Sequence, residues 1–76
     1  MATQTDPNLT HAAFTRDELV ALGLFHAGVR ARVLRERFGL DPWAVVNRHR
    51  QLAREEFARV QELAERAAAG AGGRLA

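Results

Sequence analysis

The sequence predicts an all-α fold, a three-helix domain with a long C-terminal third helix. Three observations predict this class. Helix-capping residues precede two of the apolar segments, glycines follow the first two segments at Gly28 and Gly39, and no second strand candidate accompanies the apolar residues 19–25. With 76 residues and no cysteine, the chain must rely on tight helix packing, a partner chain or both.

The first helix is predicted over residues 16–27. Thr15 lies three residues before Glu18, the spacing of a capping box, and Phe14 and Leu19 are placed for a hydrophobic staple. The centre of this helix is apolar around most of its circumference, which predicts neighbours on more than one side.

The second helix is predicted over residues 30–38 and the third over residues 42–69. Gly39 ends the second helix, Asp41 caps the third, and Pro42 takes its first position, where a missing N–H costs nothing. No helix breaker follows until Gly70, so the third helix would be about 42 Å long.

The far half of the third helix carries an apolar seam at heptad spacing. This seam folds back onto the first helix or pairs with a second copy of the chain, and the sequence leaves both alternatives open. The candidate residues for this dimer or helix-packing seam are Val20, Leu24, Phe57, Val60 and Ala64.

The flanks of the helical domain differ from it in composition. Residues 1–13 are predicted to be a flexible N-terminal arm, residues 14–69 the folded domain with its helical extension, and residues 70–76 a disordered tail. No run reaches the ~18 apolar residues of a membrane span. The N-terminus also lacks the pattern of a secretory signal, so the expected location is the cytoplasm, with no membrane partner.

The order of helix, glycine turn and helix is that of a helix-turn-helix domain, whose last helix enters the major groove of DNA. The apolar and glycine positions of that motif are occupied by Leu34, Phe38, Gly39, Leu40 and Val45. Arg48 stands where an apolar residue is common. We therefore expect Val46 and His49 to take over the core role, with a slight rotation of the third helix.

Positive charge is concentrated in the same region. Residues 30–54 carry seven Arg against two acids, a net charge of +5, whereas residues 1–29 carry −2 and residues 55–76 carry −1. All eleven cations are Arg, which suits bidentate contact with phosphate, although a GC-rich genome also favours Arg and Ala. The clustering predicts an anionic partner.

The third helix presents Asn, Arg and Gln outward, with no acid between Pro42 and Arg54. Asn and Gln can read adenine and Arg can read guanine, so the candidates for base contact are Asn47, Arg48 and Gln51. The candidates for phosphate contact are Arg30, Arg32, Arg50 and Arg54. Arg30 and Arg32 lie at the positive end of a helix dipole, where cations are disfavoured unless an anion binds. The alternative for all of them is a merely solvated polar surface.

The remaining polar and aromatic residues predict little further chemistry. Trp43 is expected either to pack over the second helix or to lie against the sugar-phosphate backbone. His11, His26 and His49 show no metal-ligand spacing, so neither a metal nor a cofactor is expected. The chain has no Cys, Ser, Lys or Tyr, which argues against an enzyme and a small-molecule substrate.

The segment HAGVRARVLRERFGLDP, residues 26–42, resembles a family of short actinobacterial helix-turn-helix proteins of unknown function. The wider stretch of residues 22–56 is similar to region 4 of sigma factors, which reads promoter DNA. These resemblances cover under half of the chain and imply a DNA-binding fold without a target, from an actinobacterium or its phage. The long Arg/Glu-rich helix after Leu52 departs from both.

The sequence thus predicts a sequence-specific protein that binds double-stranded DNA, a transcriptional regulator that acts as a homodimer. The alternative is a helical adaptor that binds a protein partner, an antitoxin-like or RNA polymerase-binding module. In that case the first helix and the seam at Phe57 and Val60 would anchor the partner.

Overall fold

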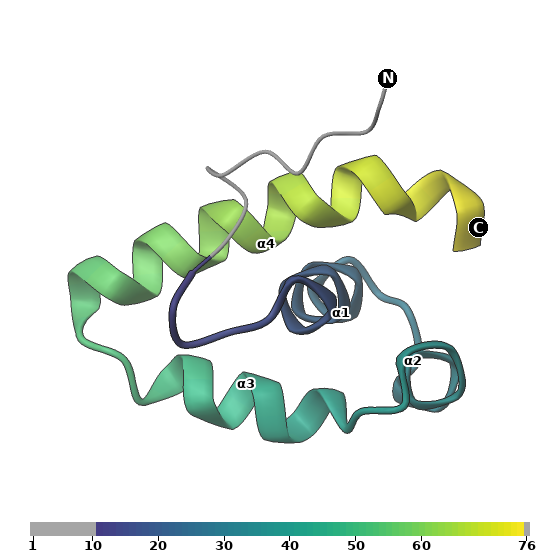
Figure 1. Ribbon diagram of the computed structural model, residues 1–76, viewed down its shortest axis with the longest axis horizontal. Helices are drawn as coiled ribbons and strands as arrows, with labels where there is room; N and C mark the ends of the chain where they lie inside the picture. Colours follow the sequence, from purple (N-terminus) through teal and green to yellow (C-terminus); the bar gives the residue numbers. More distant parts are fainter. Residues whose placement is uncertain (1–10, 76) are drawn as a thin grey trace.

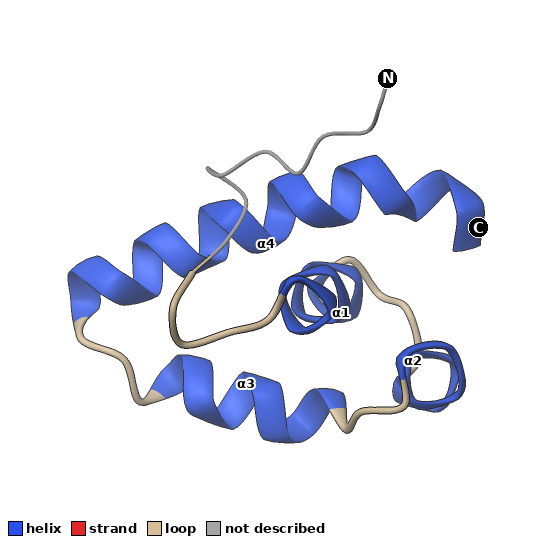
Figure 2. Ribbon diagram, in the orientation of Figure 1, coloured by secondary structure: helices blue, strands red, loops and turns tan. Residues whose placement is uncertain are grey.

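The computed structural model describes residues 11–75, with side chains described up to Gly70, and confirms the all-α class. It contains α1 (Arg16–His26), α2 (Ala31–Phe38), α3 (Pro42–Arg50) and α4 (Arg54–Leu75), and no strand lies within the described residues (Figure 2). Figure 1 shows α1 between α3 and α4, with α2 at one side of α1. None of the helices in this part of the chain is long and apolar enough to cross a membrane.

The start of α1 is fixed by the capping box that the sequence predicts. The Thr15 hydroxyl accepts a hydrogen bond from the backbone N–H of Glu18 at 3.1 Å, and the Glu18 carboxylate accepts one from the N–H of Thr15 at 2.9 Å. Phe14, just before the cap, is buried. The chain therefore enters α1 at a defined angle, with Phe14 fixed in the core.

The core lies around α1, which is buried on several sides as its all-round apolar pattern predicts. Its largest contact is with α4, along which the two helices approach closely at Gly23. A Cβ atom at position 23 would overlap the carbonyl oxygen of Ala64 and lie 2.6 Å from the Cβ of Ala68. The buried apolar residues of the core are Phe14, Leu19, Val20, Leu22, Leu24, Leu34, Val45, Val46, Val60, Leu63, Ala64, Ala67 and Ala68.

A tight turn joins α2 to α3. Gly39 has a φ of 67° in the left-handed region, which L side chains rarely adopt, and its N–H donates to the carbonyl of Arg35 at 2.9 Å. The side chain of Asp41 then accepts from the N–H of Trp43 at 3.0 Å, and Pro42 is the first residue of α3. The predicted turn chemistry is thus present, and it sets α3 at a steep angle to α2 (Figure 1).

The segment that we expected to form one long third helix is interrupted at residues 51–53. His49 at the end of α3 is 1% exposed and stacks on the ring of Phe57 in α4, with centroids 3.9 Å apart and planes at 9°. Its Nε2 lies 3.0 Å from the carbonyl oxygen of Phe57. In a continuous helix, positions eight residues apart are separated by about 12 Å, so this contact requires the break. Tertiary packing has overridden the local helix preference.

The sequence predicts a flexible arm before the helical domain and a disordered tail after it, and the structure describes part of each. Residues 1–10 of the expected N-terminal arm lie outside the described residues, and residues 11–13 are placed against α3 and α4 by contacts described below. At the other end, α4 continues to Leu75, through most of the segment that we expected to be a disordered tail.

Candidate nucleic-acid interface

The outward face of α3 presents polar side chains, and the inward face is apolar apart from His49. Val45, Val46 and His49 are buried, whereas Asn47 and Arg48 are exposed. His49 is therefore a core residue of α3 and Arg48 is not, as the sequence predicts. Three of the other candidate contacts, Gln51, Arg50 and Arg54, are also exposed.

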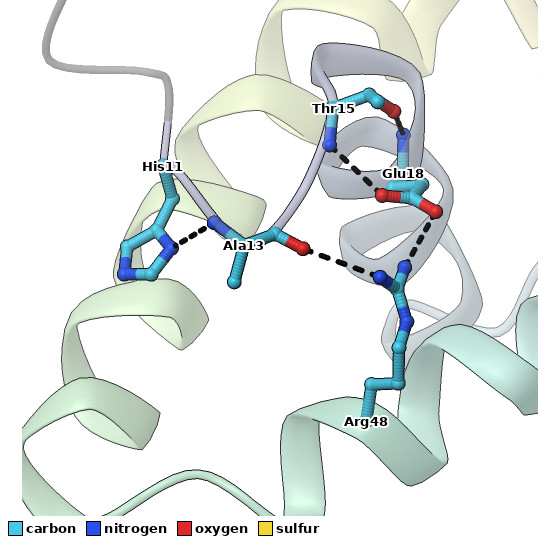
Figure 3. A network of polar contacts seen from close by, with 5 residues as sticks. All are labelled: His11, Ala13, Thr15, Glu18 and Arg48. Atoms are coloured by element: carbon cyan, nitrogen blue, oxygen red, sulfur yellow. Dashed lines mark hydrogen bonds and ion pairs between the residues drawn. The ribbon is translucent and has the colours of Figure 1, made fainter.

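Arg48 is held by contacts within the chain (Figure 3). Its guanidinium donates to the Glu18 carboxylate at 2.5 Å and to the Ala13 carbonyl oxygen at 3.2 Å, and it lies 4.8 Å from the centre of the Phe14 ring. The side chain of Arg48 is 46% exposed and that of Glu18 is 22% exposed. Of the three predicted base readers, Arg48 is therefore the one already bound to a carboxylate.

The other predicted contacts on and after α3 have no such partner among the residues that the structure describes. Asn47, Gln51, Arg50 and Arg54 make no side-chain hydrogen bond or ion pair with any other residue in the described part of the chain. Gln51 is the C-cap residue of α3 and keeps right-handed helical φ and ψ angles, so it lies one turn beyond Asn47 on the same side. Their amide groups are available to an external partner.

The predicted phosphate-binding residues of α2 differ from one another. Arg30 is the N-cap residue of α2, makes no side-chain capping hydrogen bond, and precedes a first turn without an acidic residue. Arg32 makes an exposed ion pair with Glu36 at 3.4 Å, one turn along the helix. Such exposed pairs contribute about 0.3–0.5 kcal/mol and exchange readily for another anion. Arg35, at the end of the helix, lies 3.9 Å from Asp41.

The seam residues are placed within one chain. Val20 and Leu24 of α1 and Val60 and Ala64 of α4 are all buried, with Ala64 directly over Gly23. Phe57 remains 38% exposed and covers His49. The seam therefore packs α4 onto α1, which is one of the two alternatives that the sequence left open.

Trp43 projects from the first turn of α3 and is 52% exposed. Its ring meets the ring of Phe25 in α1 edge to face, with centroids 4.9 Å apart. It thus packs on Phe25 of α1 and stays about half exposed in the first turn of α3.

Two histidines, His26 at the end of α1 and His49 in α3, lie near each other. The rings of His26 and His49 have centroids 6.1 Å apart, and His26 also lines a shallow groove with Glu65 between α1 and α4. Burial lowers the pKa of His26, although its side chain is partly exposed; His49 and Arg50 lower this pKa further and Glu65 opposes them. Within the described residues, no group of three His, Cys, Asp or Glu side chains is placed to hold a metal ion.

The partners of Arg48 were missed by sequence reasoning. Glu18 stands out in the sequence only as a capping-box residue, and nothing in its spacing from Arg48, 30 residues later, indicates the ion pair. The carbonyl of Ala13 carries no sequence signal at all. A polar residue at a motif position that is normally apolar was the one available hint that Arg48 has a local role.

No protein-family model, curated protein or solved structure matches this chain. The resemblances to short actinobacterial helix-turn-helix proteins and to sigma factor region 4 therefore stay predictions.

Proposed function

We propose that the chain binds double-stranded DNA, with α3 in the major groove and α2 across the backbone, and acts in transcriptional regulation. The observation that carries this proposal is the outward face of α3. Asn47 and Arg50 of α3 and Gln51 at its C-cap are exposed and unused by other described residues, and α3 contains no acidic residue.

Geometry supports the major groove as the place of binding. A helix joined to a preceding helix by a short glycine turn can insert its outward face while the preceding helix contacts phosphates. Asn47 and Gln51 project from one side of α3 and can each bond to an adenine edge. We assign base contact first to these two residues.

Arg48 differs from Asn47 and Gln51 because its guanidinium is already bound within the chain. To contact a base, its guanidinium must exchange the Glu18 carboxylate and the Ala13 carbonyl oxygen for DNA. While these contacts persist, Arg48 orients α3 relative to the start of α1. Arg30, Arg50 and Arg54 are then the first candidates for phosphate, because none of them is paired within the described part of the chain. Arg32, which is paired with Glu36, follows as a further phosphate contact.

The alternative of a protein-binding adaptor has less support. Its proposed anchors, α1 and Val60, are buried within the domain, and of that seam only Phe57 stays partly exposed. The exposed ring of Trp43 lies beside the polar face of α3, where it can equally contact a sugar or a phosphate. DNA binding therefore gives a role to more of the exposed side chains than binding of a protein partner does.

Fluorescence anisotropy on a labelled duplex at low salt tests the proposal. Binding should weaken linearly with the logarithm of salt concentration, and Arg50→Ala should reduce that slope by about one unit. Arg59→Ala is the matched control, because it removes the same charge from an exposed position on α4, the helix on the other side of α1. Absence of binding at micromolar protein, or an equal effect of both variants, would contradict the proposal.

A further inference from the structure

We propose that two copies of this chain exchange their α4 helices and form a domain-swapped dimer, in which α3 and α4 join through Gln51, Leu52 and Ala53 into one continuous helix. In this dimer, α4 of each copy packs on α1 of the other. The inference does not depend on DNA binding, because it rests on the connection between α3 and α4 and on the surface between α1 and α4.

The three connections between helices are built differently. The connection from α1 to α2 contains Gly28 with a φ of 107°, and that from α2 to α3 contains Gly39 with a φ of 67°. Both turns are therefore specified by residues that oppose a continuous helix. Among the described residues no other positive φ occurs, so the connection from α3 to α4 has none.

The residues of that third connection are good helix formers. Gln, Leu and Ala all rank high in helix propensity, and none is Gly, Pro or β-branched. Gln51 already has a φ of −86° and a ψ of −2°, in the right-handed helical region. A short connection between packed elements is a common site of exchange between copies. Little in the local sequence resists joining α3 and α4.

Contacts from elsewhere in the fold hold the break in place. His49 stacks on Phe57, the His11 ring bonds to Glu56 at the start of α4, and Arg48 binds the Ala13 carbonyl oxygen. Residues 11–14 therefore pass over the junction and contact both helices that meet there. These tertiary contacts, not the preferences of the connecting residues, favour the four-helix monomer.

A continuous helix cannot remain within a single copy. From Pro42 to Leu75 it would be about 50 Å long, against a largest extent of 31 Å for the folded chain. The buried face of α4 would leave α1 and expose Val60, Leu63 and Ala64 to water. That face needs a surface with a close-approach position opposite Ala64 and Ala68, and Gly23 of a second copy supplies it.

Light scattering after refolding at high protein concentration tests this inference on the full chain. The dimer fraction should rise with the concentration at refolding. It should also decay slowly on dilution, because exchange requires α4 to separate from α1. Arg54→Pro is the decisive variant. Position 54 begins α4, where proline is tolerated, but in a continuous helix proline loses one hydrogen bond and clashes with the carbonyl of residue 50.

The variant Arg54→Pro should weaken the dimer by at least ~100-fold and keep the monomer folded. Arg54→Ala removes the same charge and should dimerise like the unaltered chain. Should Arg54→Pro fail to fold, Ala53→Asp decides, because an N-cap residue before α4 favours the break and should lower the dimer fraction several-fold. A chain that stays monomeric after every refolding, or a dimer unaffected by Arg54→Pro or by Ala53→Asp, would overturn the inference.

Discussion

The closest approach between α1 and α4 provides a sharp test of the fold through the substitution Gly23→Ala. The added Cβ would overlap the carbonyl oxygen of Ala64 and lie 2.6 Å from the Cβ of Ala68. The first of these neighbours is helix backbone, so it cannot move aside alone. We expect the two helices to separate where Gly23 meets Ala64 and Ala68.

The size of the effect follows from two opposing contributions. Overpacking of a core typically costs about 1–3 kcal/mol, and a backbone overlap belongs at the upper end of that range. Alanine gains about 1 kcal/mol over glycine within a helix. The net loss should be about 2 kcal/mol, which lowers Tm by about 8–16 °C in a domain of this size.

Thermal unfolding followed by circular dichroism measures this difference. Gly70→Ala is the matched control, because Gly70 lies in α4 and a Cβ there would meet nothing within 4 Å. That variant should gain up to about 1 kcal/mol in stability. If Gly23→Ala were as stable as Gly70→Ala, the close packing of α1 against α4 would be refuted.

Two further predictions concern the polar groups around α3. A double-mutant cycle with Arg48→Ala and Glu18→Gln, measured by chemical denaturation, should give a coupling free energy of about 1 kcal/mol. This value is expected because the pair is only partly exposed and the hydrogen bond is charge-assisted. Additive effects of the two substitutions would show that the ion pair does not form in solution. Because the pKa of His26 is lowered in the folded state, protonation of His26 favours unfolding, so stability should fall as the pH drops below about 6.5. His26→Gln should make this decrease shallower, and an unchanged pH profile in that variant would contradict the assignment.

Much of the fold is encoded in local signals and could be predicted. The capping box at Thr15, the left-handed Gly39 and the Asp41 cap each act within a few residues of the chain, and all three are present as expected. The break after Arg50 could not be predicted in the same way. Its cause is the stacking of His49 on Phe57, and the residues between them favour a helix.

The candidate interface shows the same limit. Helical periodicity identified which residues of α3 face outward, because the apolar face of a helix constrains the polar one. It did not identify that Arg48 has a carboxylate partner, since Glu18 belongs to another helix and its position depends on how α1 and α3 pack. The stacking of His49 on Phe57 and the ion pair of Arg48 with Glu18 both depend on tertiary packing, so only the structure reveals them.

The central claim, that the outward face of α3 binds DNA, is tested most directly by the side-chain amide signals of the chain in a nitrogen–proton NMR spectrum. Asn47 lies on α3 and Gln51 caps its C-terminal end. Gln61 lies on α4 as an internal control, where it already donates to Glu65. On addition of a duplex, the account predicts that the signals of Asn47 and Gln51 shift while that of Gln61 does not. Unchanged signals for Asn47 and Gln51 in the presence of bound DNA would contradict it.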